Sequence, residues 1–414
     1  MDAIQNTDVV VLGAGAAGVA AAIAAARKGS KVTLIERNAY PGGKATAAEV
    51  GTVCGLYEFS KAERSAYIVK GFAKEFAEAL QKASGTKPLF SSEGLHYLPY
   101  DIEVFKNICL GLLKENNIEV CFNAALTNIK IENKIINTAF ITARDSTMEV
   151  RLKSIIDCSG DSIISQAANL PLIKSEQYQA AAQVFTMQGI AEENEARLGM
   201  ILMKALRSAI DDKKLADFYD RVYIVQGSLK NNTVSLKVGI PIPVTHTPEN
   251  LQELKTAAHD FVETLSGFLI NNIPAFKNTS IQHIAPEPGI RVGLRTTGNY
   301  TLTEEDVLSC KKFDDAIANA SWPIEEWEQH KRVKMRYFSL DDFYQVPAGC
   351  LQSKFITNLF MAGRNISATN AAIASARVMG ICLQTGYAAG CLASAMTKGL
   401  PQSETIKSIQ NEQL

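Results

Sequence analysis

Two arginines, Arg291 and Arg295, have the residue type and spacing that could anchor an anion. They stand four residues apart in a segment that is interrupted by three glycines. A guanidinium presents a planar set of N–H donors that matches a carboxylate, so the pair predicts a catalytic anchor for a substrate carboxylate or a similar group. The alternative is a pair of structural salt bridges at a domain junction. Arg377 has the same two interpretations.

His283 precedes the arginine segment, and we predict it as the catalytic base because an imidazole exchanges protons near neutral pH. His96, Tyr97 and Tyr300 are the alternatives. A lone histidine is more often an ordinary surface or core residue. The sequence therefore leaves the identity of the general acid or base open.

Metal chemistry has little support in the sequence. The eight cysteines are scattered singly, without a CxxC pair or a cluster of cysteines and histidines. The chain also lacks a Walker-type phosphate loop and a Ser/His/Asp arrangement for nucleophilic catalysis. We predict no metal site, and most of the cysteines as reduced core thiols.

A glycine-rich turn near the N-terminus predicts dinucleotide binding. The run Gly13-Ala14-Gly15-Ala16-Ala17-Gly18 follows a β-branched stretch and opens a strongly helical one. Its glycines permit the tight turn, the close approach of the pyrophosphate and the packing of helix on sheet, and the helix N-terminus offers free N–H groups. Glu36 ends the next strand, where a carboxylate accepts hydrogen bonds from both ribose hydroxyls and repels a 2′-phosphate. This pattern disfavours NADP.

A second glycine pair follows at Pro41-Gly42-Gly43, and the stretch from Gly13 to Gly43 resembles the two-dinucleotide-binding flavoproteins of the glutathione-reductase type. Residues 291–306, 361–379 and 155–161 resemble segments of the FAD-dependent oxidoreductases of the fumarate-reductase-like type. The likeness covers nearly the whole chain and is weakest between about 171 and 280. It implies FAD as the cofactor, while the substrates of this family are mostly unassigned.

The resemblance also implies roles for individual residues. Leu126 would reach the adenine, Gly363-Arg364 the pyrophosphate or ribityl chain, and a helix starting near Asn370 would aim its N-terminus at the flavin pyrimidine ring. The residues implied for FAD are Gly13, Ala14, Gly15, Ala16, Ala17, Gly18, Glu36, Arg37, Gly42, Gly43, Lys44, Ala45, Thr46, Leu126, Ser159, Gly160, Gly363, Arg364, Asn370, Ala372 and Ile373. Two departures weaken part of this picture: members commonly carry histidine where this chain has Asn370, and further arginine where it has Thr296-Thr297.

Features absent from the sequence narrow the chemistry of the flavin. Disulfide reductases of this superfamily place a cysteine pair after the second glycine pair, whereas this chain has Cys54 alone. No histidine stands at positions 44–46, where members with covalent flavin carry one, so we predict non-covalent FAD. No second Rossmann fingerprint occurs. Electrons would therefore come from the substrate or pass to or from an external partner.

The elements around these motifs predict an α/β fold. Residues 8–12, 16–28 and 31–35 form a βαβ unit, which requires a parallel sheet, residues 61–84 have helical periodicity, and a β-meander over residues 118–158 ends in a buried strand. We predict a discontinuous, Rossmann-like FAD-binding domain with a central parallel sheet and the meander, residues 1–170 and 335–414. A mixed α+β substrate or cap domain would occupy residues 171–334.

Composition bears on partners and location. The 42 basic and 43 acidic side chains nearly cancel, so there is no basic surface for nucleic acid or anionic lipid. Residues 378–396 carry no charge, but they are mostly small, which favours a buried helix over a membrane span. The N-terminus has no basic region typical of a signal peptide, so we expect a cytoplasmic protein. The oligomeric state stays open.

Together these features predict an FAD-dependent oxidoreductase that transfers a hydride between a small organic substrate and non-covalently bound FAD. A reductase of an activated double bond, fed by an external electron donor, is one alternative. A non-catalytic FAD-binding redox partner is another.

Overall fold

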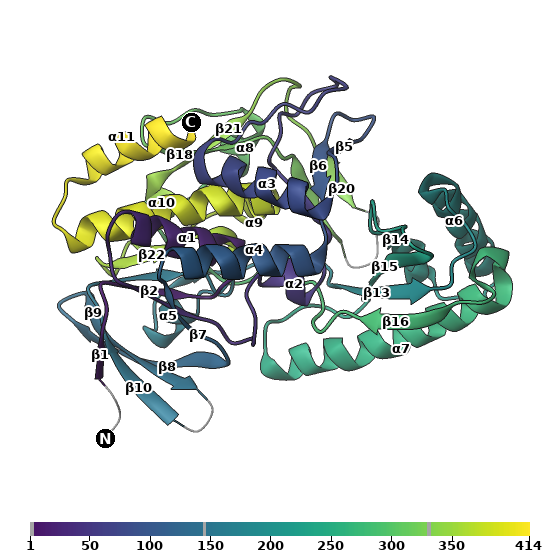
Figure 1. Cartoon of the computed structure of the whole chain (residues 1–414), viewed down its shortest axis with the longest axis horizontal. Helices are drawn as coiled ribbons and strands as arrows, with labels where there is room; N and C mark the ends of the chain where they lie inside the picture. The colour runs from purple at the N-terminus through teal and green to yellow at the C-terminus, as the bar shows by residue number, and fades with distance from the viewer. Residues whose placement is uncertain (1–3, 144–145, 329–332) are drawn as a thin grey trace.

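The computed structural model describes residues 4–143, 146–328 and 333–414. A five-stranded parallel sheet, in the order β22-β11-β2-β3-β7, forms the centre of the larger lobe (Figure 1). Four of its strands are wholly buried and most of their residues are apolar, which is typical of a parallel sheet covered on both faces. The strands are β2 (Val9–Leu12), β3 (Val32–Ile35), β7 (Glu119–Cys121), β11 (Ser154–Asp157) and β22 (Leu359–Met361).

Helices α1 (Ala16–Arg27) and α10 (Met379–Thr397) pack against each other beside this sheet (Figure 1). Their contact is close because small residues face each other: a Cβ at Gly386 would collide with the Ala17 carbonyl oxygen, and one at Gly390 with that of Ala21. Residues 380–395 of α10 are all buried. Burial inside the protein therefore accounts for the long uncharged stretch. The helices α3 (Gly71–Ser84), α4 (Ile102–Glu115) and α11 (Gln402–Gln413) complete this layer.

No single helix in the described part of the chain is long and apolar enough to cross a membrane. Helix α9 (Asn370–Ala376) and α10 pass the same length and composition test only as a pair, and the pair is bent by 95°.

The predicted meander is a four-stranded sheet in the order β1-β10-β9-β8. Its strands are β1 (Ile4–Asn6), β8 (Ala124–Glu132), β9 (Ile135–Ala143) and β10 (Ser146–Arg151). Strand β7, which we expected at the start of the meander, instead pairs in parallel with β3 and extends the central sheet. The predicted helix over residues 61–84 begins only at Gly71, whose φ of +53° interrupts a helical run.

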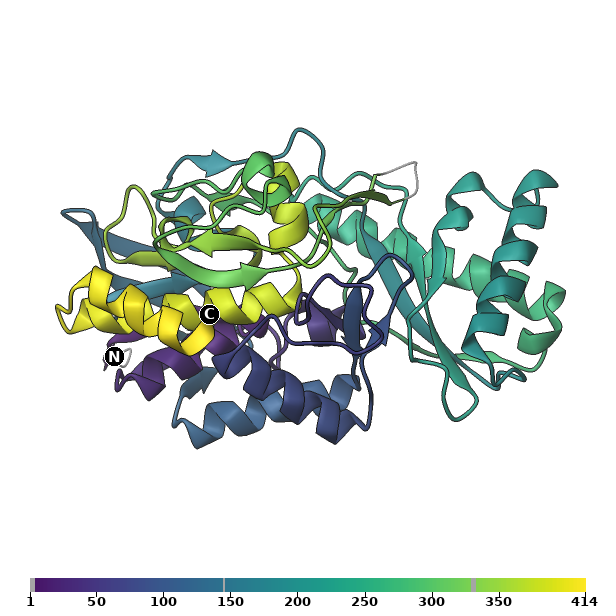
Figure 2. The same ribbon diagram turned by 90° about the horizontal axis from the view of Figure 1, so that it is seen from above.

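A second lobe stands apart from the first and carries its own core (Figure 2). Its antiparallel sheet has the order β14-β15-β13-β16, and the helices α6 and α7 pack against it. The elements are β13 (Ala182–Gln188), α6 (Glu195–Asp211), η1 (Asp217–Arg221), β14 (Val222–Ile224), β15 (Thr233–Gly239), α7 (Pro248–Asn272), η2 (Pro274–Phe276) and β16 (Ser280–Ile284). Thr247 caps α7 and Pro248 opens it, at a position where proline costs no helical hydrogen bond.

Much of the region after residue 291, which we assigned to the second domain, packs in the core of the larger lobe. Val292, Leu302, Ile317 and Trp322 belong to that core. The remaining elements are α2 (Lys44–Ala47), β4 (Thr52–Cys54), β5 (Leu89–Phe90), β6 (His96–Pro99), α5 (Ile163–Ala167), β12 (Leu172–Ile173), β17 (Arg295–Thr296), α8 (Glu304–Leu308), β18 (Ala316–Ala320), β19 (Ile324–Glu326), β20 (Lys334–Arg336), β21 (Tyr344–Pro347), η3 (Ala348–Cys350) and η4 (Gly363–Asn365).

Candidate functional site

One long cavity begins at the glycine turn after β2 and reaches residues of the second lobe. Its empty space amounts to about 1540 Å³, including the part open to solvent. The carboxyl ends of β2, β3 and β11 open onto it, which is where parallel α/β sheets bind their ligands. We call the part near the turn the dinucleotide end.

The glycine turn has the shape that a bound diphosphate requires. Gly13 has a φ of +95°, and a Cβ there would lie 2.7 Å from the Cys158 carbonyl oxygen. A Cβ at Gly43 would lie 2.8 Å from the Cα atom of Gly15, so the second glycine pair packs directly on the first turn. Gly15 caps α1 without a side-chain hydrogen bond, which leaves the first N–H groups of the helix for a ligand.

Glu36 stands at the end of β3 with its carboxylate fixed in place. One oxygen accepts a hydrogen bond from the Ala14 N–H at 2.6 Å and the other from the Asn38 N–H at 2.9 Å. Burial raises its pKa, although both backbone donors oppose the shift. Each carboxylate oxygen retains a further lone pair, so Glu36 fits the two ribose hydroxyls that the sequence assigns to it.

A three-membered ion cluster lies at the same end. The Glu287 carboxylate pairs with the Lys44 ammonium at 2.6 Å and with the Arg37 guanidinium at 2.8 Å. Burial raises the pKa of Glu287, but the two cations outweigh it and hold that pKa at about 2. Burial lowers the pKa of Lys44 to about 8. Through these two ion pairs, Glu287, in the segment after β16, contacts Arg37 and Lys44, in the segment after β3.

Arg364 and Gly160 face each other across the cavity wall. Gly160 has a φ of +82°, and any Cβ there would collide with the Arg364 guanidinium. Arg364 Nη1 donates to the Ile290 carbonyl oxygen at 2.8 Å, which holds the guanidinium in place. Both residues line the cavity, as do Ser159 and Gly363. A cation is therefore fixed beside the dinucleotide end.

The structure brings together most of the residues predicted to bind FAD. Those that line the cavity are Gly13, Gly15, Ala16, Ala17, Glu36, Arg37, Gly42, Gly43, Lys44, Ala45, Ser159, Gly160, Gly363 and Arg364. The others lie outside this lining: Ala14, Gly18, Thr46, Leu126, Asn370, Ala372 and Ile373. Ala14 and Gly18 are buried within the glycine turn and the start of α1, and Leu126 packs at the start of β8.

The helix N-terminus that lines the cavity is that of α10, whereas the family resemblance implies that of α9, near Asn370. Arg377, Val378, Met379 and Cys382 line the cavity, and Val378 caps α10 without a side-chain hydrogen bond. The sharp bend between α9 and α10 turns α10 toward it. Helix α9 is instead capped by the Thr369 hydroxyl, which accepts from the Ala372 N–H. The partial positive charge of α10 therefore points at the cavity.

The other end of the cavity holds a group that we call the cationic end: Lys237, Arg291 and Arg377 around Glu325 and Trp327. The Arg291 guanidinium carbon lies 4.1 Å from the centroid of the Trp327 ring, and Lys237 Nζ lies 4.7 Å from that centroid. Burial lowers the pKa of Lys237 to about 8 and that of Arg291 to about 9. Both cations therefore stand in a poorly solvated place.

Arg295 and His283 lie outside the cavity lining. Arg295 is fully buried and donates to the Asn370 side-chain oxygen and to Ser175 Oγ at 3.3 Å. His283 is half exposed on β16 and pairs with Glu49 at 2.6 Å. These contacts favour structural roles for both side chains. Of the three predicted catalytic residues, only Arg291 faces the cavity.

Sequence reasoning missed Lys237, Glu325 and the two tryptophans, Trp322 and Trp327. The only available signal was composition, because the chain has two tryptophans and they flank Glu325 at close spacing. Cys54 also lines the cavity, and burial raises the pKa of its thiol to about 12, so it is no nucleophile at neutral pH. Among the described residues, no group of three or more His, Cys, Asp and Glu side chains is placed to hold a metal ion.

Two solved structures of hydroxylases have a fold similar to that of this chain. The aromatic hydroxylase CabE from angucycline biosynthesis matches with a TM-score of 0.52 and 11% identity over 100% of this chain and 66% of its own. The anhydrotetracycline hydroxylase OxyS from Streptomyces rimosus matches with a TM-score of 0.51 and 12% identity over 99% of this chain and 66% of its own. These likenesses confirm the predicted α/β fold with a Rossmann-type FAD-binding unit.

A search of curated protein sequences finds no match. The family model described as "FAD dependent oxidoreductase" matches residues 8–412, almost the full length of the chain. This match confirms FAD as the cofactor and an oxidoreductase as the class of enzyme. The chain therefore belongs to the FAD-dependent oxidoreductase family.

Proposed function

We propose that this enzyme transfers a hydride between a small organic substrate and non-covalently held FAD. The observation that carries the proposal is the continuity of the cavity. A single space joins the dinucleotide end, at Gly13 and Glu36, to the cationic end, at Lys237 and Arg291. A ligand in one end therefore meets a ligand in the other without crossing a protein wall.

The dinucleotide end fits FAD. Glu36 would hold the ribose hydroxyls, the glycine turn and the start of α1 the diphosphate, and Arg364 would offset its charge. Among the described residues that line the cavity there is no histidine, the residue type that the family uses for covalent attachment. When bound, FAD supplies the two-electron chemistry that no side chain can.

The chain's own residues orient the substrate and set the electrostatics of the site. The first turn of α10 directs partial positive charge into the cavity, which stabilises any negative charge that develops there. Trp322 and Trp327 contribute large apolar surfaces that exclude water. Oxidation of the substrate breaks one C–H bond, whose electron pair leaves as hydride. The accompanying proton passes to solvent.

Anaerobic reduction tests this proposal. The FAD-loaded protein is mixed with hydroxy acids, amines, sugars and polyols while the flavin absorbance is recorded. Bleaching by one class supports a dehydrogenase. If none bleaches the flavin, but the dithionite-reduced protein is reoxidised by fumarate-like acceptors, the alternative of a double-bond reductase replaces it. Flavin that stays with the acid-precipitated chain would contradict non-covalent binding.

A further inference from the structure

The cationic end carries more positive than negative charge. Among the described residues of this end, Glu325 carries the one carboxylate, and it already has partners. It accepts the indole N–H of Trp322 at 3.1 Å and that of Trp327 at 2.9 Å, and it lies 3.6 Å from the Arg377 guanidinium. Burial raises the pKa of Glu325, but Arg377 and Arg291 outweigh that effect, so it stays ionised. One negative charge therefore stands against three positive ones.

Two of these cations form no direct ion pair in the described part of the chain, although the charge of Glu325 acts on both. Within residues 4–143, 146–328 and 333–414, neither Lys237 nor Arg291 forms an ion pair with a carboxylate. Arg291 donates to the Ala180 carbonyl oxygen and lies over the ring of Trp327. Lys237 lies over the rings of Trp327 and Tyr223. Arg377 also keeps a buried Nε without a hydrogen-bond partner in this part of the chain.

Such an arrangement raises the free energy of the protein when no anion is bound. Buried cations that repel one another cost free energy unless an anion neutralises them. A structural role would be served better by neutral side chains of the same size, or by a second carboxylate. The three positive charges instead point to an anion that enters with the ligand.

We propose that the cationic end binds a carboxylate group of the substrate through Lys237 and Arg291. Ala182, Val184 and Met379 line the cavity beside the two tryptophans and offer an apolar wall for the rest of the molecule. This inference rests on the proposed function and names its substrate class. The substrate class is thus a carboxylic acid with an apolar or aromatic body.

Ligand binding without turnover tests the inference. Both tryptophans of the chain lie in this cavity, so intrinsic fluorescence reports on this site alone. The FAD-loaded protein is titrated with benzoate, phenylacetate and succinate, and with their neutral amides, by fluorescence and by calorimetry. We expect at least one acid to bind about tenfold or more tightly than its amide, because a charge-assisted hydrogen bond is lost with the carboxylate. Equal binding of each acid and its amide would overturn the inference.

Variants identify the residues responsible. Lys237→Met should weaken binding of the acid about tenfold or more and leave the weak binding of the amide unchanged. Lys237→Arg keeps the charge and should retain most of the affinity. The matched control is Lys130→Met, since Lys130 also lies over an aromatic ring, that of Phe140 at 5.1 Å, but on β8 and outside the cavity lining. Undiminished acid binding by Lys237→Met would contradict the assignment.

The two proposals fail separately. If acids bind at the cationic end but no compound reduces the flavin, the hydride-transfer function fails and the carboxylate site stands. If a neutral amine or sugar bleaches the flavin and acids neither bind nor compete with it, the carboxylate site fails and the dehydrogenase stands.

Discussion

Glu36 is the residue on which dinucleotide affinity should depend most. Its carboxylate is buried and fixed by two backbone N–H groups, so it meets a ribose without reorganising. Glu36→Ala should weaken FAD binding by about 1.5–3 kcal/mol, the range for hydrogen bonds to a charged group. The measurement is the recovery of FAD fluorescence on dilution. Glu132→Ala, at an exposed strand end, is the control, and equal affinities in the two variants would contradict the assigned role.

The pH dependence of carboxylate binding follows from Lys237. Burial and the charges of Arg291 and Arg377 lower its pKa to about 8, while Glu325 and Cys54 raise it. The ammonium that attracts the ligand is therefore lost as the pH rises through about 8. We expect benzoate or succinate affinity to fall between pH 7 and pH 9, measured by calorimetry, about tenfold per pH unit at most for one proton.

The same titration of Lys237→Met separates this group from its neighbours. The variant should show a flatter profile, because the guanidinium of Arg291 keeps its proton over this pH range. An unchanged profile would assign the pH dependence to another group, of which Lys44 at the dinucleotide end is the first candidate.

Local pattern decides which site residues the sequence can predict. Glu36 follows from its place at the end of a strand after a glycine turn, because every part of that unit is contiguous in the chain. Lys237 sits in the middle of an ordinary strand, and Glu325 on another strand 88 positions later, by the numbering of the chain. Nothing near Lys237 marks it, and only the two flanking tryptophans mark Glu325. They meet only because the lobes fold against one another.

Helices α1 and α10 can lie close together only because their contact surface consists of glycine and alanine. Gly386→Ala should destabilise the protein by about 1–3 kcal/mol, the usual cost of an extra methyl group in a packed core, because the Cβ collides with the Ala17 carbonyl oxygen. Thermal unfolding measures the effect. Gly111→Ala on α4, where no heavy atom lies within 4 Å of the new Cβ, should instead stabilise by up to about 1 kcal/mol. Equal effects of the two substitutions would contradict the close packing.

Element boundaries show where sequence patterns end. The helical spacing of residues 61–84 continues through Ile68, yet Ile68 packs on the core from a non-helical segment, and the helix begins at Gly71. Apolar spacing alone does not distinguish a helix from an irregular segment that packs on the same core. Likewise α9 and α10 form one continuous small-residue sequence. Only their tertiary packing, with its 95° bend, determines that α10 and not α9 faces the cavity.

At the scale of the whole molecule, the family resemblance predicts the lobe that binds the cofactor better than the lobe that completes the cavity. The glycine turn, Glu36 and residues 361–379 carry recognisable motifs, and the large lobe has the expected parallel sheet. The boundary after residue 291 could not be predicted, because the return of the chain into the first core depends on contacts distant in sequence, such as those of Val292 and Ile317.

Glu287 should contribute to holding the two parts of the cavity wall together. It pairs with Arg37 and Lys44 from the segment after β3, and its own N–H donates to the Ala47 carbonyl oxygen at 2.8 Å. Glu287→Gln leaves Lys44 without its compensating charge in a place where burial already lowers the pKa of that ammonium. We expect a loss of about 1–3 kcal/mol in the free energy of unfolding, the cost of a buried polar group without its partner. Thermal or urea unfolding at pH 7 measures it.

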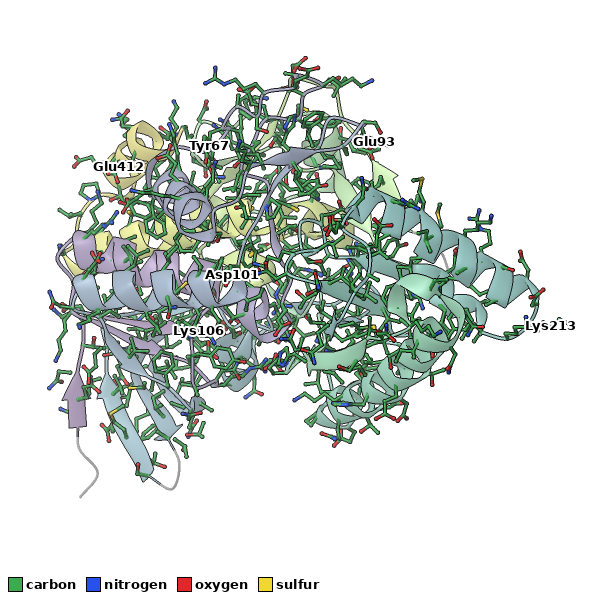
Figure 3. The ribbon with its side chains drawn as sticks, turned by 45° about the vertical axis from the view of Figure 1, so that its right-hand side comes forward. Tyr67, Glu93, Asp101, Lys106, Lys213 and Glu412 are labelled. Carbon is green, nitrogen blue, oxygen red and sulfur yellow. The ribbon has the colours of Figure 1, made fainter. Side chains whose placement is uncertain are left out.

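The stability of the protein should also depend on pH through Glu287. The cations hold the pKa of Glu287 at about 2, below its ordinary value. The ion pairs therefore stabilise the folded state at every pH above the ordinary pKa of a glutamate. This contribution is lost as the pH falls toward 2. The wild-type protein should therefore lose more stability than Glu287→Gln between pH 6 and pH 3. Lys230→Met is the control, since it breaks the exposed pair between Lys230 of the second lobe and Asp101, which Figure 3 labels on the large lobe. Exposed ion pairs contribute about 0–1 kcal/mol to the free energy of unfolding, so Lys230→Met should lose little stability. If it loses as much as Glu287→Gln, then any contact between the lobes, and not this carboxylate, stabilises the cavity wall.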